Sequence, residues 1–528
     1  MAIYIGDKTT TSLADKTYIE KYGISELVLM ENAGQAAFDR IIKIEKELLG
    51  TNNEELEEYI TNQVFNKICI LCASGNNGGD GFVLARKLDY IGRDVEVLLL
   101  TSIDKMTESA LANYKILTKL GIKISHYKDL VDSDSGFEYL VKNLNTFDLL
   151  IDAVFGVGIN RPIKDTYKSL FNYINFTRDK KKIRVISIDI PSGLDPDIGL
   201  PVSSIDNSGD AIMADYTISF DYFKKGFINY KSEIYTGRVY VEELKCKRYI
   251  QEEVGLRDRF IYENDLKFEK MNSSYHKGDF GRVCIFAGSE GFYGAARLAV
   301  ESAVSAGAGL VTLVTSQDVQ SVLATNLFEA MTCSYDDEER LDQLVLKAKS
   351  IAIGPGIGVN QTCIDKLSYI SEKTDVPIIV DADAIRVFSQ AKLKLSSRYI
   401  LTPHLGEFSS LIGVDIETIS KDRLYYAKKY AKEKGLILVL KGKNTIITDG
   451  DRALVNTTGN EGMARGGMGD CLTGIIASLA SRYEPFEAAY KGVYIHGLCG
   501  DEIYKESFTV KASELIKIIP KVMKLMYN

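Results

Sequence analysis

The apolar positions of the first half of the chain change their period along it. Over residues 8–49 they recur at helical spacing around the segment LMENAG, which predicts helix. A polar insert, GTNNEELEEYITNQ, follows and predicts an exposed helix or loop. Beyond it, helix-length segments, among them one over residues 130–144, alternate with the β-rich runs KICILCA, VEVLLL, DLLIDAVF and RVISIDI. This alternation predicts a parallel sheet with helices on both faces.

The alternation stops around residues 242–265, where the chain becomes strongly charged. It then resumes with GRVCIFAG, LVTLVTS, IAIGPG, PIIVDADA, YILTPHLGEF and LILVLKGKNTIITDG. A helix rich in Ala, Ser and Gly, GAARLAVESAVSAGAG, lies between the first two strands and predicts close helix packing. We therefore expect one α/β domain over residues 1–245, a linker over 246–265 and a second α/β domain over 266–528.

Length and charge agree with two enzyme-sized domains. The chain has 528 residues, 45% of them hydrophobic, which exceeds what one core serves. Acidic residues outnumber basic ones by 72 to 64, without any Lys/Arg-rich block, so nucleic-acid and acidic-lipid partners are not expected. The sequence has neither a signal-peptide core nor a bilayer-length apolar run, and we expect a cytoplasmic protein without a membrane partner. We also expect a homo-oligomer, whose size the sequence does not specify.

The eight cysteines are spread along the chain, which predicts free thiols in a reducing compartment. Cys69 and Cys72 have CxxC spacing, but they fall within the expected strand KICILCA. An offset of three sends two strand side chains to opposite faces. We therefore expect neither a zinc site nor a redox pair there.

A glycine-rich turn near the end of the chain, GNEGMARGGMGD, leads directly into an apolar segment with helical spacing. The backbone amides around Gly466, Gly467 and Gly469 should point out of a helix N-terminus, which is an anion site. Asp470 lies in the same turn and can accept a proton from a hydroxyl held beside a bound phosphate. The alternative is that the glycines only permit a tight, closely packed turn.

Three loops of the first half follow strands, at the sheet edge where ligands of such folds gather. SGNNGGDG opens into a helix and suits a diphosphate, although its spelling matches neither common nucleotide-binding motif. FGVGINRP and PSGLDPDIG follow later strands. Asp152 and Asp189 each close an apolar strand, where a carboxylate is costly unless it is paired, bound to a cation or used as an acid or base. Either residue alone could instead cap the next helix.

The segments LMENAG, SGNNGGDGFVLAR, DAVFGVG and IDIPSGLDPDIG resemble the NAD(P)H-hydrate epimerase domain, over roughly residues 1–245. The resemblance implies a Rossmann-like three-layer fold and a potassium ion held by Asn77, Asp152 and Ser192, whose oxygen atoms suit a hard cation. It implies that Asp189 moves the proton that lets a ring carbon change configuration. The residues that it implies for binding the damaged dinucleotide are Asn76, Asn77, Gly78, Gly79, Asp80, Gly156, Val157, Gly158, Ile159, Asn160, Arg161, Pro162, Tyr167 and Asp189.

Loops of the second half also follow its strands. Two of the four histidines, His276 and His404, lie in these loops, where a structural and a functional role are equally expected. In KGKNT, Lys441 and Lys443 can meet phosphate charge, and Thr445 has a hydroxyl that can donate. This half therefore offers a second anion site.

The motifs HKG, GSEGFYGAARLA, GPGIG, DADA, TPHLGE, KGKNT and GGMGD, in this order, resemble the ADP- or ATP-dependent NAD(P)H-hydrate dehydratase, over roughly residues 265–528. The resemblance implies a ribokinase-like α/β fold, with Ala295, Gly358, His404 and the catalytic Asp470 on the hydrated dinucleotide. It implies that the adenine nucleotide is held by Lys441, Gly442, Lys443, Asn444, Thr445, Glu461, Gly462, Met463, Ala464, Arg465, Gly466, Gly467, Met468 and Gly469.

Two positions depart from the usual spelling of these motifs. Leu405 stands where proline is more common, and Met468 stands where serine is frequent. Neither change removes a charge or a backbone amide, so we expect at most a shift in affinity.

Together the two resemblances imply a repair enzyme for hydrated NADH and NADPH. One half interconverts the R and S hydrates, and the other dehydrates the S form with ADP or ATP as co-substrate and Mg²⁺ on the phosphates. One alternative is a ribokinase-like small-molecule kinase, which would release a stable phosphoester. The other is a non-enzymatic dinucleotide-binding scaffold.

Overall fold

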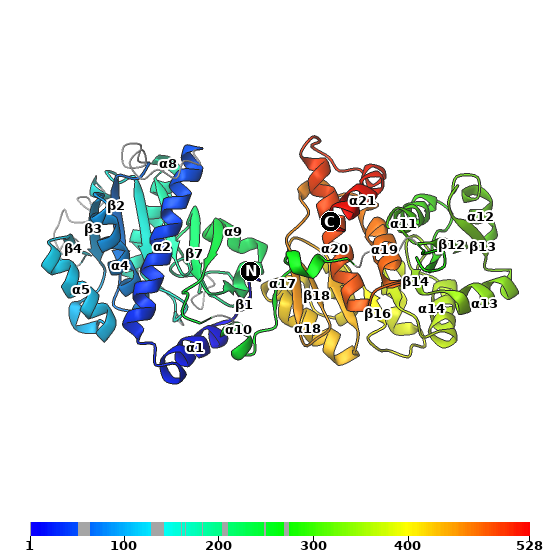
Figure 1. Ribbon diagram of the computed structural model, residues 1–528, viewed down its shortest axis with the longest axis horizontal. Helices are drawn as coiled ribbons and strands as arrows, with labels where there is room; N and C mark the ends of the chain where they lie inside the picture. The colour runs from blue at the N-terminus through cyan, green and yellow to red at the C-terminus, as the bar shows by residue number, and fades with distance from the viewer. Residues whose placement is uncertain are drawn as a thin grey trace. The chain divides into compact units, whose positions relative to one another are not determined.

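The computed structural model describes residues 2–50, 64–127, 142–159, 161–163, 165–181, 183–202, 210–247, 250–268 and 274–527. It divides into two compact units, Ile3–Leu256 and Arg257–Asn528 (Figure 1). The segment expected as a linker is shared between them, because strand β10 (Arg259–Phe260) pairs with the sheet of the second unit. The polar insert and most of the helix expected over residues 130–144 lie outside the described residues.

The first unit contains a seven-stranded sheet in the order β4-β3-β2-β5-β6-β7-β9, and all its neighbouring strands are parallel, as predicted. A short parallel pair, β1 with β8, forms a separate sheet. The strands of this unit are β1 Ile5–Gly6, β2 Lys67–Cys72, β3 Asp94–Leu99, β4 Lys123–His126, β5 Leu149–Ala153, β6 Arg184–Ile188, β7 Tyr216–Phe220, β8 Phe223–Lys224 and β9 Arg238–Glu242.

Both faces of this sheet are buried. Cys72 belongs to an apolar cluster with helices α2 and α4, whereas Cys69 belongs to another cluster with helix α8, so the two thiols point to opposite faces as predicted. The helices of this unit are α1 Lys8–Lys16, the π-helical turn η1 Thr17–Lys21, α2 Glu26–Leu49, α4 Asn76–Tyr90, η2 Ile103–Lys105, α5 Glu108–Leu120, α8 Asp165–Lys181, η3 Lys225–Ile228, η4 Tyr230–Ser232, α9 Glu233–Thr236 and α10 Ile250–Glu253.

The second unit contains a ten-stranded sheet in the order β10-β19-β18-β17-β16-β15-β14-β11-β12-β13. Its pairs are parallel except along β17-β18-β19, which form two antiparallel pairs. The remaining strands are β11 Arg282–Phe286, β12 Leu310–Thr315, β13 Met331–Ser334, β14 Ser350–Ile353, β15 Ile378–Val380, β16 Tyr399–Leu401, β17 Ile437–Leu440, β18 Thr445–Thr448 and β19 Ala453–Asn456.

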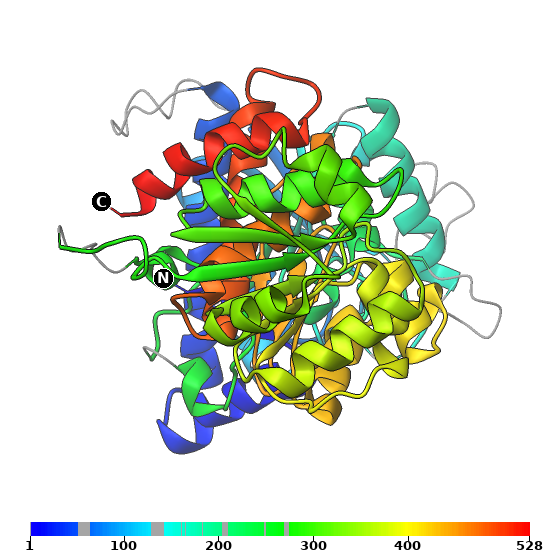
Figure 2. The same ribbon diagram turned by 90° about the vertical axis from the view of Figure 1, so that its right-hand side faces the viewer.

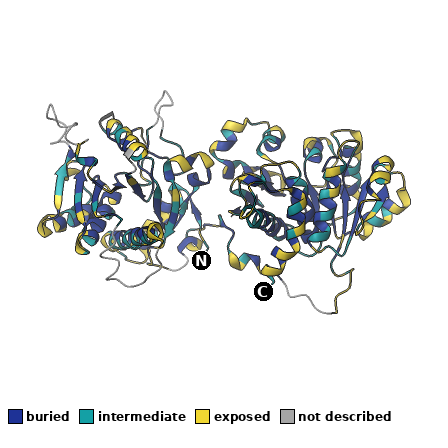
Figure 3. Cartoon of the chain, turned by 90° about the horizontal axis from the view of Figure 1, so that it is seen from above, coloured by how far each residue is buried: buried dark blue, intermediate teal, exposed yellow. Residues whose placement is uncertain are grey.

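Helices lie on both sides of these strands (Figure 2) and turn their exposed sides to solvent (Figure 3). They are η5 Glu263–Leu266, α11 Tyr293–Ser305, α12 Gln317–Leu323, α13 Glu338–Lys347, α14 Gln361–Lys373, α15 Asp383–Val387, η6 Phe388–Gln390, α16 Leu405–Ile412, α17 Ile416–Lys421, α18 Arg423–Lys434, η7 Glu461–Met463, α19 Met468–Ala480, α20 Pro485–Tyr504 and α21 Ala512–Met526. Among the residues that the structure describes, no helix is both long and apolar enough to cross a membrane.

Helix α19 packs closely on the small-residue helix α11. A Cβ on Gly474 would lie 2.1 Å from the carbonyl oxygen of Ala299 and 2.9 Å from Cβ of Ser302. The two backbones approach this closely because glycine faces small residues, which confirms the packing predicted for the Ala- and Ser-rich helix. This contact sets where the N-terminus of α19, and with it Asp470, lies in the unit.

We predict that Gly474→Ala lowers the free energy of unfolding of the second unit by about 1–3 kcal/mol, because the added methyl group overpacks the contact. Hydrogen exchange of α11 and α19 peptides in urea measures this unit within the full chain. Gly294→Ala is the matched control, since a Cβ on Gly294 meets no atom within 4 Å. Equal exchange in the two variants would contradict the prediction.

Candidate functional site

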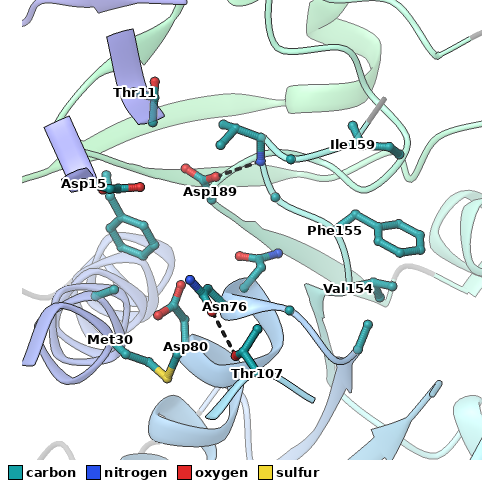
Figure 4. Close-up of a pocket in the computed structure, with 18 of the residues that line it drawn as sticks. Thr11, Asp15, Met30, Asn76, Asp80, Thr107, Val154, Phe155, Ile159 and Asp189 are labelled. Atoms are coloured by element: carbon teal, nitrogen blue, oxygen red, sulfur yellow. Dashed lines mark hydrogen bonds between the residues drawn. The ribbon is translucent and has the colours of Figure 1, made fainter. Parts of the chain in front are cut away.

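A cavity of about 800 Å³ opens in the first unit where two of the predicted loops, those after β2 and β5, meet the end of β6 (Figure 4). Asn76 and Asp80 reach it from the first turns of α4, Ile159 from the loop after β5, and Asp189 from the end of β6. Because the strands are parallel, their carboxyl ends bring these loops to one edge of the sheet.

Asp189 is held from two sides. Its Oδ1 lies 2.8 Å from the ammonium nitrogen of Lys224, whose side chain is 1% exposed, and its Oδ2 accepts a hydrogen bond from the amide of Val157 at 3.3 Å. Its φ of 66° lies in the left-handed region, which is uncommon for a residue with a side chain. A Cβ on Gly156 would lie 3.1 Å from Asp189 Oδ2, so this glycine lets the loop approach the carboxylate.

Asp152 is fully buried below the cavity. Its carboxylate accepts hydrogen bonds from the hydroxyls of Ser187 and Ser192 and from the amide of Ser192. Burial raises the pKa of Asp152, and these hydrogen bonds oppose the increase. The hydroxyl oxygen of Ser192 also accepts a hydrogen bond from the amide of Phe155 at 2.8 Å, which ties the loop after β5 to the loop after β6.

Asn77 is the other residue expected to bind potassium, and its amide group is buried. Among the described residues, neither its Oδ1 nor its Nδ2 has a hydrogen-bond partner. A buried amide normally finds one, so this group has capacity for a ligand. The position that a Cβ on Gly156 would take lies 3.5 Å from Cβ of Asn77 and 3.1 Å from Asp189, which places the amide near the carboxylate of Asp189.

Most of the residues predicted to bind the dinucleotide line the cavity. Gly78 and Gly79 instead serve close packing, because a Cβ on Gly78 would lie 2.0 Å from the carbonyl oxygen of Ala73 and one on Gly79 would lie 2.4 Å from Met30. Asn160 lies outside the described residues. The predicted residues in the cavity wall are Asn76, Asn77, Asp80, Gly156, Val157, Gly158, Ile159, Arg161, Pro162, Tyr167 and Asp189.

Sequence reasoning missed several residues of this wall. Thr11 and Asp15 come from α1, and Tyr222 and Lys224 come from the segment after β7. Lys224 was detectable by the argument used for Asp189, since it follows an apolar strand of the same sheet. Asp15 had no such signal, because it lies in a helix far from the glycine-rich loops in the sequence.

In the second unit, α19 begins as predicted at the glycine-rich turn. Gly467 is its N-cap residue with a φ of 91°, and Asp470 lies in its first turn. Burial, and then the nearby charge of Asp381, raise the pKa of Asp470 to about 6, while Lys441 opposes the shift. The carboxyl of Asp470 can therefore change its protonation state near neutral pH.

Lys441, which was expected to meet phosphate charge, forms an ion pair with a buried carboxylate. Its Nζ lies 2.8 Å from Oδ1 of Asp381, a residue that is 1% exposed, and Oδ2 of Asp381 accepts a hydrogen bond from the hydroxyl of Thr473 at 2.7 Å. A Cβ on Gly469 would lie 3.3 Å from the same ammonium nitrogen. Sequence reasoning missed Asp381, although it follows strand β15 as Asp189 follows β6.

The KGKNT loop connects β17 to β18, and Arg423 forms hydrogen bonds with its backbone. This buried guanidinium donates hydrogen bonds to the carbonyl oxygens of Lys443 and Leu440. Thr445 donates its hydroxyl hydrogen to the carbonyl oxygen of Gly442 at 2.8 Å, so the expected neutral donor is already used within the loop. Asn444 has a φ of 54°. These hydrogen bonds therefore fix the conformation of the loop without a bound ligand.

The segment before α19 is fixed at its other end. The hydroxyl of Tyr504 donates to Glu461 at 2.8 Å, and the carboxylate of Asp501 accepts from the amide of Gly459 and the side chain of Asn460. The turn η7 follows, and the exposed residues Ala464, Arg465 and Gly466 lead to the helix N-terminus. The predicted nucleotide loop therefore consists of a short helical turn, an exposed stretch and the start of α19.

Besides Asp470, the residues expected on the hydrated dinucleotide lie in the first turn of α11, in the loop after β14 and at the N-cap of α16. A Cβ on Gly356 would lie 3.1 Å from Cβ of Ala295, so the loop that carries Gly358 adjoins α11. The amide of Gly358 donates to Oδ2 of Asp383 at 2.9 Å. His404 caps α16 through Nδ1, which accepts from two backbone amides, while its side chain stays 57% exposed. The structural role expected as one alternative for this histidine is therefore present.

Comparisons with known proteins match both halves. A family model described as YjeF-related protein N-terminus matches residues 26–226, and one described as NAD(P)H-hydrate dehydratase matches residues 283–521. A solved structure from Bacillus subtilis, described as ADP/ATP-dependent NAD(P)H-hydrate dehydratase co-crystallized with ATP/Mg²⁺, is 32% identical and has a TM-score of 0.46. The match covers 51% of this chain and 98% of the Bacillus subtilis chain.

Relatives with the name bifunctional NAD(P)H-hydrate repair enzyme Nnr match almost the whole chain. The Thermofilum pendens protein is 32% identical over 532 residues, which cover 97% of this chain and 95% of the relative. The Moorella thermoacetica protein is 33% identical over 530 residues, which cover 97% and 94%. These matches confirm the predicted family, and the chain belongs to the bifunctional NAD(P)H-hydrate repair enzymes.

Proposed function

We propose that the first unit interconverts the R and S hydrates of NADH and NADPH, and that the second unit dehydrates the S hydrate with ADP or ATP as co-substrate. The observation that carries the proposal is common to both units. A glycine-rich helix N-terminus, that of α4 or α19, lies near a carboxylate with a lysine partner 2.8 Å away. A helix N-terminus attracts phosphate, and the polar cluster beside it can move protons.

In the first unit, the dinucleotide would lie along the loops of residues 76–80 and 156–162. Asp189 would exchange a proton with the hydrated ring, because its carboxylate reaches the cavity while Lys224 and the amide of Val157 fix its position. Gly156 supports this placement, since its lack of a side chain leaves the carboxylate accessible.

Potassium is proposed to bind at Asn77, Asp152 and Ser192. The residues fit this ion by chemistry, because the unpartnered amide of Asn77 supplies a neutral oxygen, Asp152 a carboxylate and Ser192 a hydroxyl, and hard cations prefer such ligands. When bound, the ion would supply positive charge near the loops that hold the diphosphate. The hydrogen bonds that Ser192 makes with Phe155 and Asp152 would hold the loops after β5 and β6 together.

In the second unit, Asp470 would take the proton from the hydrate hydroxyl, whose oxygen attacks the terminal phosphoryl group of the nucleotide. The shortened nucleotide, AMP from ADP or ADP from ATP, departs with the electron pair of the broken P–O bond. The phosphate on the ring then leaves with the C–O electron pair, a neighbouring ring carbon loses a proton to solvent, and the ring double bond forms. The amides of residues 466–469 would stabilise the transferring phosphoryl group, because amides in the first turn of a helix have no intrahelical acceptor.

Magnesium is proposed to accompany the nucleotide and screen its phosphates. Among the described residues, no cluster of three or more His, Cys, Asp or Glu side chains could hold a metal ion. Its ligands would thus be mainly phosphate oxygens and water, as magnesium favours. The preference between ADP and ATP, the homo-oligomeric state and the cytoplasmic location stay predictions.

We predict that Asp470→Asn lowers dehydration at least 100-fold and leaves epimerisation within about twofold of wild type, since general-base catalysis contributes about 10²–10⁴-fold. Asp189→Asn should do the reverse. The measurement is recovery of dihydronicotinamide absorbance from S hydrate, with a separate assay of R-to-S conversion. Loss of both activities in either variant would refute the two-site assignment. Release of a stable phosphoester would instead favour a small-molecule kinase.

The pH profile of dehydration should show Asp470 acting as a base. A base must be ionised, so kcat/KM should rise as the pH passes upward through about 6, the pKa of Asp470, and then level off. Lys441→Met should move this limb to higher pH, because the ammonium group lowers that pKa. In Lys443→Met, an exposed lysine of the same loop, KM for the nucleotide should change while the limb stays in place. An unmoved limb in Lys441→Met would contradict the assignment.

Potassium should slow hydrogen exchange of the peptide that spans residues 149–156. At a concentration 100 times the Kd, exchange through opening should slow about 100-fold relative to choline chloride, because only the folded loop binds the ion. Asn77→Ala should abolish the difference, whereas Asn76→Ala should keep it. Equal exchange of the wild-type protein in the two salts would exclude the site.

A further inference from the structure

The charged residues in the cavity wall of the first unit include three aspartates and a lysine from four different elements. Asp15 comes from α1, Asp80 from α4, Asp189 from the end of β6 and Lys224 from β8. Figure 4 shows the side chains of Asp15, Asp80 and Asp189 converging on the same space. Carboxylates that share one cavity repel each other, which favours protonation of at least one of them.

The three carboxyl groups have different surroundings. Asp189 has the ammonium of Lys224 at 2.8 Å and the amide of Val157 at 3.3 Å. Burial, with the charges of Asp189 and Asp15, holds the pKa of Asp80 well above its usual range. Burial and then Asp189 raise the pKa of Asp15 to about 6, while Lys224 opposes the increase. The cluster thus contains an ion-paired carboxylate, a neutral acid and a group that titrates near physiological pH.

Asp15 lies in the cavity wall and is exposed to solvent. Water in the cavity screens its neighbours' charges, and a dinucleotide that fills the cavity would displace that water. Substrate binding should therefore strengthen the preference of Asp15 for its protonated form. The charged groups that face Asp15 are Asp189, Lys224, Asp221, Glu26 and Asp80.

We propose that Asp15 is the second proton-transfer residue of the epimerase site and works as the acid partner of Asp189. The inference rests on the epimerase activity proposed above. Groups in one cavity whose environments separate their protonation states are suited to act as an acid and a base. Asp80 keeps its proton too firmly for this role, and it can serve as a hydrogen-bond donor to the substrate.

The step balances as follows. Asp15 gives its proton to the hydroxyl on the hydrated ring carbon, the C–O bond breaks, and water leaves with the bonding pair while the ring nitrogen lone pair forms a C=N bond. Water adds to the other face of that carbon, the nitrogen regains its lone pair, and Asp189 takes the proton that the added water loses. The cavity solvent returns this proton from Asp189 to Asp15. The opposite inversion uses the same two groups in exchanged roles.

The test uses Asp15→Asn in the full chain, with one purified hydrate of NADH and no adenine nucleotide, so dehydration is silent. Chromatographic separation of the two configurations gives the rate. We expect kcat to fall about 100-fold with KM nearly unchanged, because the variant keeps the shape of the side chain and loses the proton. Asp15→Glu should recover part of the rate. Glu20→Gln, an exposed neighbour outside the cavity wall, is the matched control and should behave as wild type.

The pH profile separates proton transfer from a structural role. Wild-type kcat/KM should fall as the pH rises above about 6, and Asp15→Asn should lack this limb. In ¹⁸O-labelled water, each inversion should carry solvent oxygen into the hydrate. A variant rate within threefold of wild type, an unchanged alkaline limb, or inversion without label would overturn the inference. Wild-type protein that fails to exceed the spontaneous rate would instead overturn the epimerase function itself.

Discussion

In both units, a carboxylate that directly follows a parallel strand forms an ion pair with a lysine from another element. Lys224 lies 2.8 Å from Asp189, and Lys441 lies 2.8 Å from Asp381. Removing either lysine would leave an uncompensated charge in the interior, which costs several kcal/mol. Near each pair lies a further carboxyl group, Asp15 or Asp470. Burial, and then the charge of the paired aspartate, raise the pKa of that group to about 6.

Glycine residues allow the neighbouring loops to approach these ion pairs closely. Gly156 lies against Asp189, and Gly469 lies against Lys441, each at a distance that a larger side chain would fill. Several neighbouring residues with side chains have positive φ angles, among them Asp189, Ala382 and Asn444. Such conformations cost free energy and persist only where the surrounding structure holds them. In this protein the buried Arg423 and the ion-paired Lys224 supply that support beside the loops.

The two α/β units were predictable from the sequence because apolar residues recur at different spacings in strands and in helices. Short apolar runs separated by helix-length segments lead to a parallel sheet, and the glycine-rich turns mark the ends of its strands. The segment expected as a linker was harder to interpret. Its charged sequence hides strand β10, which pairs with β19 through backbone hydrogen bonds and so needs little apolar signal of its own.

The sequence by itself determined which glycine-rich loops and aspartates follow the strands, because glycine spacing and strand-terminal aspartates are properties of short segments. Only the tertiary structure decided which charges meet. Asp15 stands outside every glycine-rich loop, Lys441 reaches Asp381 across 60 residues, and Lys224 reaches Asp189 from a separate two-stranded sheet. The choice of partner depends on how distant segments are brought together, and the protonation state of each carboxyl group follows from that choice.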